Sequence, residues 1–238
     1  MNMKLAAHRC GTDKYPELTL DAARYSLELG ADCVEMDIRF TRDGVPVINH
    51  DKDGAKLFGT MKNVCDLTLK EFQELRYLDN QNCHPHTLEE VLASGVGPIL
   101  FHIKEGKEQL DIILSYIRKY DYEDKVIIGV MEVEDVARVK NFNSNIKVLS
   151  FNSDRSATDD FLEAGADIIR LWEEWVTEAK VKLVKNHGRE VWVMAGSPEK
   201  NTTGYTGVAQ LRQWKDMEVD GIIINEIGKT KQILQEMM

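Results

Sequence analysis

The feature that most constrains the fold is an alternation of short apolar runs with segments of helical periodicity along the chain. Eight apolar runs have the length and residue types of buried strands: Lys4–His8, Cys33–Phe40, Ile99–Lys104, Lys125–Val130, Ile146–Phe151, Asp167–Leu171, Glu190–Met194 and Gly221–Asn225. The segments with helical periodicity are Thr19–Leu29, Lys107–Tyr120, Val133–Asn141, Ser156–Glu163, Glu178–Asn186, Gly207–Met217 and Ile227–Met237. Gly30, Gly165 and Gly188 follow three of them, and glycine commonly ends a helix because it adopts the left-handed conformation.

Strands that alternate with helices favour a parallel sheet, so the sequence predicts an α/β fold. Three junctions resemble one another, at Leu29–Asp32, Ala164–Asp167 and Glu218–Gly221. Eight repeated units in 238 residues fit a (β/α)8 TIM barrel that occupies residues 1–238 as a single domain. A doubly wound open sheet is the alternative, but no GxGxxG follows the first strand to support a dinucleotide site.

One region interrupts the alternation, between His50 and Pro98. We expect a small helical insertion after the second strand, at approximately residues 51–96, with helices at Leu67–Arg76 and Thr87–Ala93. Such an insertion lies on the same face of a barrel as an active site. The His84-Pro85-His86 segment within it is interpreted as a polar loop rather than a metal site.

Charge and composition limit the possible partners. The net charge of −10 and the acidic pI of about 5.2 argue against nucleic acid and anionic membranes, which both require a basic face. No apolar run approaches the ~18 residues of a membrane span. The four cysteines form no CxxC pair and no signal peptide is recognisable, so a reduced, cytoplasmic setting is expected. Nothing in the sequence indicates the oligomeric state.

Polar residues gather where the predicted strands end, which is where parallel barrels carry their chemistry. The residues that share this position are His8, Arg9, Glu35, Asp37, His50, Asp51, His102 and Lys104. Glu35 and Asp37 are two residues apart and so lie on one side of their strand, as do His102 and Lys104. Each of these residues alone could be a cap or a surface group, but together they indicate a site.

The chemistry of this set indicates metal-assisted phosphoryl transfer or hydrolysis. Two carboxylates in an apolar strand are unfavourable without a partner, and a divalent cation such as Mg²⁺ or Ca²⁺ would compensate Glu35 and Asp37. Two histidines beside that cation are candidates for general acid and base. Arg9 and Lys104 could hold a phosphate group.

These residues also carry a resemblance to a known family. The stretch from Ala7 to Asp51 resembles the signature of glycerophosphodiester phosphodiesterases, in order and spacing. The matching segments are His8-Arg9-Cys10, Pro16-Glu17-Leu18-Thr19, Glu35-Met36-Asp37, Asp43-Gly44 and His50-Asp51. Pro85–Glu90 and Val219–Ile222 resemble later family segments more weakly.

The resemblance implies a barrel that hydrolyses glycerophosphodiesters, small-molecule substrates, to glycerol 3-phosphate and an alcohol. It implies His8 and His50 as the acid and base, and Arg9, with Lys104 beside it, as phosphate ligand. It also implies Glu35 and Asp37 as ligands of a divalent cation. Glu17 would be a further metal ligand or a partner of substrate or His8.

The sequence departs from the family pattern at four places. His102 stands where the family has a third metal-binding glutamate, and as a ligand it would favour Zn²⁺ or Mn²⁺ over Mg²⁺ or Ca²⁺. Cys10 replaces a glycine, and Leu18 replaces an asparagine. The ends of the seventh and eighth strands, at Ala195-Gly196 and Asn225-Glu226, also differ.

These departures make the usual substrate uncertain and leave two alternatives open. One is a phosphodiester lyase or cyclising phosphotransferase of the phospholipase-C/D-like barrels. The other is a non-catalytic barrel that binds a phosphate ligand. The run Leu171–Trp175 could line the pocket for the leaving alcohol, or its tryptophans could pack on the barrel.

Overall fold

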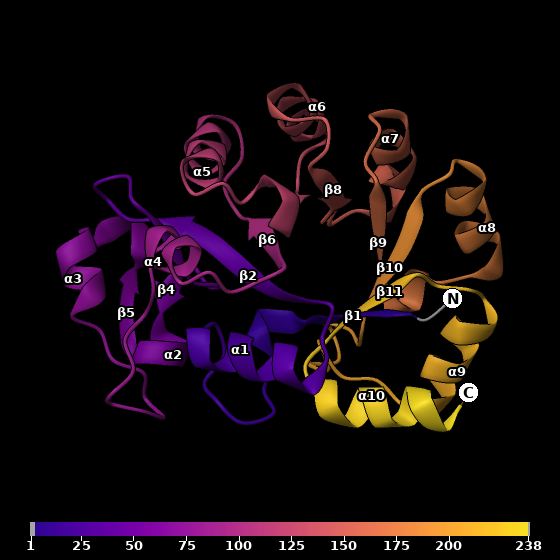
Figure 1. Cartoon of the computed structure of the whole chain (residues 1–238), viewed down its shortest axis with the longest axis horizontal. Coiled ribbons are helices and arrows are strands. Elements are labelled where there is room, and N and C mark those ends of the chain that lie inside the picture. Colours follow the sequence, from indigo (N-terminus) through magenta and orange to yellow (C-terminus); the bar gives the residue numbers. More distant parts are fainter. Residues whose placement is uncertain (1–2, 238) are drawn as a thin grey trace.

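A computed structural model of the chain describes residues 3–237; Met1, Asn2 and Met238, which the expected domain limits include, lie outside the described residues. Eight parallel strands form its centre (Figure 1): β1 (Lys4–Ala7), β2 (Cys33–Phe40), β6 (Ile99–Ile103), β7 (Val126–Val130), β8 (Lys147–Ser150), β9 (Ile168–Trp172), β10 (Glu190–Met194) and β11 (Gly221–Ile224). Successive strands of this set pair in parallel, and β1 pairs with both β2 and β11, which closes the sheet. The predicted (β/α)8 barrel is therefore confirmed, and the open sheet is excluded.

Helices surround the barrel (Figure 1): α1 (Leu20–Leu29), α4 (Leu88–Ala93), α5 (Glu108–Lys119), α6 (Val133–Phe142), α7 (Thr158–Glu163), α8 (Glu178–Asn186), α9 (Val208–Asp216) and α10 (Ile227–Glu236). Threonine side chains start three of them, since Thr19, Thr87 and Thr177 accept backbone hydrogen bonds from the first turns of α1, α4 and α8. Within residues 3–237, none of the helices combines the length and apolar character that crossing a bilayer requires.

The helix α4 takes the place of the barrel helix between β2 and β6. Its Glu89 accepts hydrogen bonds from Lys119 Nζ at 2.6 Å and from Tyr120 Oη at 2.7 Å, at the end of α5. The sequence pattern predicts this helix as part of the insertion. The segment that departs from the barrel pattern therefore ends before α4.

The side chains of the barrel strands alternate between two apolar clusters. On β2, Val34, Met36 and Ile38 belong to the large cluster between barrel and helices. Cys33, on the opposite side of β2, joins a smaller cluster with Ala6, Leu100, Leu149, Ile168, Trp192 and Ile223, which fills the barrel interior. Because strand side chains alternate with period two, Glu35 and Asp37 point to the interior as Cys33 does.

The insertion contains short elements: β3 (Pro46–Ile48), antiparallel to β2, then β4 (Asp53–Gly54), α2 (Ala55–Phe58), β5 (Thr60–Asn63) and α3 (Leu69–Gln73). The helix expected at Leu67–Arg76 is shorter than predicted, because Thr68 caps its start with Glu71 and the helical conformation ends after one further turn. The hairpin β4–β5 and α2 were not predicted, since elements of two to four residues carry no readable periodicity.

The insertion has its own apolar core, formed by Val47, Phe58, Val64, Leu67, Phe72 and Tyr77. The ring of Phe58 meets Phe72 and Tyr77 edge to face, with centroids 6.1 and 5.0 Å apart. Tyr77 Oη donates a hydrogen bond to the carbonyl oxygen of Leu18 at 3.3 Å, in the loop after β1. The insertion is thereby attached to the end of the barrel that carries the polar strand ends.

The opposite end of the barrel interior is closed by a charged cluster around Glu190. Its carboxylate accepts hydrogen bonds from Lys4, Lys147 and Trp192 Nε1, at 3.0, 2.6 and 3.0 Å. Partial burial raises the pKa of Glu190, but these hydrogen bonds outweigh it and lower the pKa from 4.5 to about 2. The contribution of Glu190 to stability is therefore present above about pH 4.5 and is lost as the pH falls toward 2.

We expect Glu190→Gln to lower the unfolding free energy by roughly 1–2 kcal/mol at neutral pH, because two lysines then lose a charged partner. The deficit relative to wild type should shrink as the pH falls from about 4.5 toward 2, because the Glu190 carboxylate is protonated first in the unfolded chain and only near pH 2 in the folded protein. Urea denaturation at several pH values measures this. A deficit that stays constant with pH would contradict the assigned role of the charge.

Candidate active site

The interior polar side chains of β2 and β6, with those of His8 and Arg9 just after β1, open into a pocket of about 470 Å³ at the carboxyl ends of the strands. One side of the pocket carries residues predicted from the sequence: His8, Arg9, Glu35, Asp37, His50, His102 and Lys104. The other side is formed by Met131, Phe151, Ser153, Arg170, Trp172, Glu174, Trp175, Met194, Pro198, Glu199 and Thr203. The structure thus brings the predicted site residues together in one pocket except Glu17 and Asp51, and Asp51 contacts His50 from outside the pocket lining.

The two carboxylates of β2 lie at the base of the pocket. Glu35 is 1% exposed and Asp37 is 0% exposed. The backbone N–H of Arg9 donates to Glu35 Oε2 at 2.8 Å, and Lys104 Nζ forms an ion pair with Asp37 Oδ1 at 2.8 Å. Neither oxygen of Asp37 accepts a well-oriented hydrogen bond from any residue within 3–237.

The electrostatics of this pair reflect burial and repulsion. Burial, together with the negative charge of Asp37, raises the pKa of Glu35. Burial would also raise the pKa of Asp37, but Lys104 and His102 hold it well below its usual value. Lys104 pairs with Asp37 directly, whereas the guanidinium group of Arg9 pairs with Glu17, so the two buried carboxyl groups are only partly compensated and the arrangement favours a cation.

His8 follows β1 in a 3-10 turn at His8–Cys10. Asn225, just after β11, directs its amide: Nδ2 donates to the carbonyl oxygen of Thr203 at 3.2 Å, so Oδ1 faces His8 Nδ1 at 2.7 Å. His8 Nδ1 must then carry the proton, which leaves the Nε2 lone pair free. Burial and the nearby Arg9 lower the pKa of His8 to about 4.

His50 lies in the loop after β3. Arg39 Nε donates to the carbonyl oxygen of His50 at 2.8 Å, which fixes the backbone. Its Nδ1 lies 2.7 Å from Asp51 Oδ1, so Nδ1–H donates a hydrogen bond to the carboxylate and the Nε2 lone pair is free. Burial lowers the pKa of His50, and Asp37 and Asp51 partly oppose the shift.

The side chain of Arg9 is held by Glu17. Glu17 Oε1 accepts hydrogen bonds from Arg9 NH1 at 3.1 Å and from Lys56 Nζ, in α2 of the insertion, at 2.7 Å. Glu17 does not line the pocket, and it does not belong to the group of potential metal ligands formed by Glu35, Asp37 and His102. Its observed position is that of a partner of Arg9, and the metal-ligand alternative for Glu17 has no geometric support.

Two departures from the family pattern fall on unusual backbone conformations. Cys10 has φ of 70° and Leu18 has φ of 61°, both in the left-handed region. Glycine and asparagine tolerate that region better than cysteine or leucine. Both side chains are fully buried, so apolar packing compensates for the unfavourable backbone.

His102 faces the carboxylates from β6. Its Nδ1 lies 3.0 Å from Asp37 Oδ1 and accepts a hydrogen bond from Lys104 Nζ at 3.0 Å, while its Nε2 is buried without a partner among the described residues. The ring stacks on Phe151, with centroids 3.7 Å apart. Gly129 of β7 permits this stack, because a Cβ there would lie 2.4 Å from the Phe151 ring.

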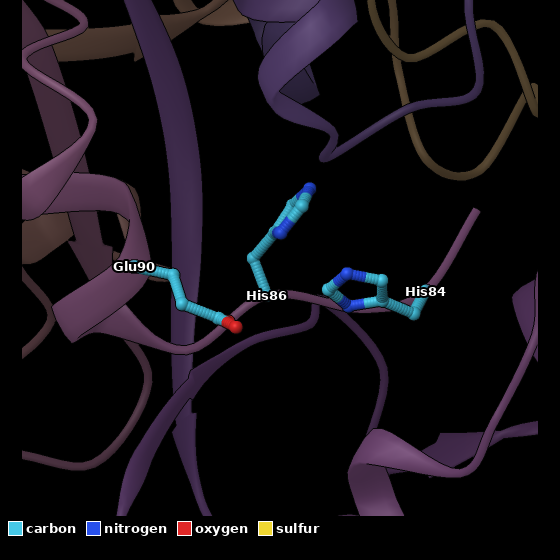
Figure 2. Close-up of side chains that lie close together, drawn as sticks. All are labelled: His84, His86 and Glu90. Atoms are coloured by element: carbon cyan, nitrogen blue, oxygen red, sulfur yellow. The ribbon is translucent and has the colours of Figure 1, made fainter.

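Two groups among residues 3–237 have the composition of a metal site. Glu35, Asp37 and His102 each offer a ligand atom, all within 4.8 Å of one another. Figure 2 shows the second group, His84, His86 and Glu90, at the start of α4. Glu90 Oε2 already accepts from Thr87 N at 2.7 Å as part of the helix cap, and none of the three lines the pocket. The group of Glu35, Asp37 and His102 fits a divalent cation better, because both oxygens of the buried Asp37 carboxylate lack a well-oriented hydrogen bond among the described residues.

Sequence reasoning singled out neither Arg170 nor Phe151, and it noted Asn225 only as a departure. The signal was available in the strand period: Ile168, Arg170 and Trp172 occupy alternate positions of β9, as Ile223 and Asn225 do at the end of β11. Trp172 and Trp175, which could equally have packed on the barrel, do line the pocket.

Comparison with known proteins identifies relatives. The sequence model of the glycerophosphoryl diester phosphodiesterase family matches residues 8–229. Lysophospholipase D GDPD3 of Mus musculus is 30% identical over 149 residues, which are 57% of this chain and 45% of the relative. Human glycerophosphodiester phosphodiesterase 1 is 36% identical over 99 residues, 40% of this chain and 30% of the relative. The matched parts thus span less than half the length of these relatives.

The fold is shared with solved structures. A phosphodiesterase of Oleispira antarctica, whose structure holds the product sn-glycerol-3-phosphate, superposes with a TM-score of 0.82 at 16% identity. The match covers 98% of this chain and 96% of that one. At this identity, the likeness establishes the barrel architecture.

We expect Glu35→Gln to raise the unfolding free energy in the presence of EDTA by about 1 kcal/mol, because the substitution removes repulsion between two buried carboxylates. The amide oxygen can still accept from Arg9 N. Urea denaturation measures the change, and Glu163→Gln, at an exposed position of α7, serves as the control. A variant at Glu35 that is less stable than wild type would show that the carboxylate is not a source of strain.

Proposed function

The chain belongs to the glycerophosphoryl diester phosphodiesterase family, and from this membership we propose that it hydrolyses glycerophosphodiesters to glycerol 3-phosphate and an alcohol. The observation that carries the proposal is the placement of two histidines, each with a free Nε2, on one pocket with two buried carboxylates. Residues 1–238 would act as one catalytic barrel domain with its insertion.

The two histidines would divide the proton transfers. His8 Nε2 takes the proton of the attacking hydroxyl group as its oxygen bonds to phosphorus. The phosphorus–oxygen bond to the alcohol then breaks, and the departing oxygen takes a proton from Nε2 of His50, which would enter the step as an imidazolium with its Nδ1–H on Asp51. Exchange with solvent then removes the proton from His8 and returns one to His50. Asn225 and Asp51 support these roles because each directs Nδ1 away from the pocket and Nε2 toward it.

The positive groups would stabilise the phosphoryl oxygens. The cations that would do so are Arg9, which Glu17 orients, and Lys104, which lies beside Asp37, and both line the pocket. Glu35 and Asp37 would hold a divalent cation, with His102 as a third ligand, and the bound ion would neutralise charge that develops on the phosphoryl group. Carboxylates favour Mg²⁺ or Ca²⁺, and the imidazole shifts the preference toward Mn²⁺ or Zn²⁺.

The test is cleavage of glycerophosphocholine by metal-stripped protein to which single divalent cations are returned. We expect at least one cation to restore release of glycerol 3-phosphate. His8→Ala and His50→Ala should each lower kcat by roughly 10²–10⁴-fold, the usual contribution of a general acid or base.

The matched control is His187→Ala, at the exposed end of α8, which should retain wild-type kcat. A cyclic glycerol phosphate as the accumulating product would contradict hydrolysis and indicate the lyase alternative. Equal kcat in wild type and His8→Ala would contradict the acid–base assignment.

A further inference from the structure

Arg170 is a buried cation in the pocket wall, and no carboxylate of residues 3–237 forms an ion pair with it. It points inward from β9, and only 3% of the residue is exposed. Its NH2 donates to the carbonyl oxygen of Asn152 at 2.7 Å, whereas Nε and NH1 have no hydrogen-bond partner among the described residues. A guanidinium group with two unsatisfied donors in an apolar setting is strongly unfavourable in the absence of a ligand.

The other buried cations of the pocket differ in this respect. Arg9 pairs with Glu17 at 3.1 Å, and Lys104 pairs with Asp37 at 2.8 Å. No ion pair of Arg170 occurs within residues 3–237, and burial alone lowers its pKa to about 9. Arg170 is therefore the cation of this pocket whose charge the protein leaves uncompensated.

Aromatic rings surround the guanidinium group. Its central carbon lies 4.6 Å from the ring centroid of Trp172, 5.5 Å from that of Phe151 and 5.7 Å from that of Trp175. Such contacts stabilise a cation but satisfy none of its N–H donors. Since Phe151 also stacks on His102, Arg170 is connected to the carboxylate side of the pocket through one ring.

We propose that Arg170 binds a carboxylate carried by the alcohol portion of the substrate, so that the preferred glycerophosphodiester has an anionic group besides its phosphodiester. The inference rests on the proposed function. Arginine suits the role because its planar group binds a carboxylate through two parallel hydrogen bonds, which here would come from Nε or NH1 together with an N–H of NH2. Arg170 enters the pocket from β9, whereas Arg9 and Lys104, to which the proposed function assigns the phosphoryl group, follow β1 and β6.

The rim of the pocket narrows the substrate class further. Glu174 and Glu199 line the same pocket and are exposed, so they disfavour a second phosphate but can receive an ammonium group. A hydroxy amino acid carries both a carboxylate and an ammonium group. The geometry thus fits a glycerophosphodiester of such an alcohol, with its carboxylate at Arg170 and its ammonium group toward the rim.

Binding at Arg170 has a spectroscopic consequence. Nε and NH1 are covered by protein atoms, so an incoming carboxylate must displace part of the ring stack to reach them. Trp172 and Trp175 are both in that stack. Tryptophan fluorescence should therefore change when the carboxylate binds, and it provides a readout that does not depend on turnover.

The test compares diesters that differ by one charged group, using His8→Ala protein with a returned cation so that binding is measured without cleavage. Glycerophosphoserine and glycerophosphoethanolamine differ only by a carboxylate. Bis(glycerophospho)glycerol and glycerophosphoglycerol differ by a second glycerophosphate. Calorimetry and tryptophan fluorescence give the Kd of each of the four diesters. The same measurements are made on protein that also carries Arg170→Gln or Arg170→Lys. Arg189→Gln, at an arginine outside the pocket, is the control.

We expect glycerophosphoserine to bind about tenfold more tightly than glycerophosphoethanolamine, the usual effect of a charge-assisted hydrogen-bond pair. Arg170→Gln should abolish this ratio and change the Kd of glycerophosphoethanolamine less than threefold, about the scatter of a neutral substitution. Arg170→Lys should retain part of the ratio.

Three results would overturn the inference: no preference for the serine diester, no binding of either member of that pair, or an equal loss for both in Arg170→Gln. A larger Arg170-dependent preference in the glycerophosphate pair would overturn the assignment to a carboxylate and indicate a phosphate. Wild-type protein that cleaves none of the four diesters would contradict the proposed function, while an Arg170-dependent binding ratio would still support this inference.

Discussion

The structure depends on one unfavourable arrangement, the two carboxylates of Glu35 and Asp37 buried side by side on the inner face of β2. Burying them requires compensation, and the nearby groups provide part of it. Lys104 contributes a charge at 2.8 Å and the backbone of Arg9 contributes a donor at 2.8 Å. The donor from Arg9 is available only because the chain turns through left-handed conformations at Arg9 and Cys10.

The barrel makes this arrangement possible by bringing separate strand ends to one place. Period-two alternation directs Glu35, His102 and Arg170 inward from β2, β6 and β9, while the outward residues of the same strands pack on helices. The insertion reaches the site through Lys56 on Glu17 and Tyr77 on the Leu18 carbonyl. The orientation of Arg9 consequently depends on a segment that is not part of the barrel.

The sequence was sufficient for elements whose periodicity extends over several residues. Cys33–Phe40 and Glu190–Met194 coincide with β2 and β10, and the inward placement of Glu35 and Asp37 follows from their spacing. The sequence was insufficient where contacts between distant segments determine the surroundings of a side chain. The pairing of Glu17 with Lys56 joins segments 39 residues apart, and Arg170 is distinctive only because no carboxylate lies beside it, which a sequence does not reveal.

The most direct test of the account is the location of a divalent cation in crystals soaked with Mn²⁺. The buried charge deficit predicts an anomalous peak between Glu35 and Asp37, about 2.0–2.6 Å from an oxygen of each carboxylate. His102 would complete the ligand set if its ring nitrogen also lies within about 2.3 Å of the peak. An empty carboxylate pair, with the peak at His84, His86 and Glu90 instead, would contradict the claim that the fold is built around a cation in the barrel.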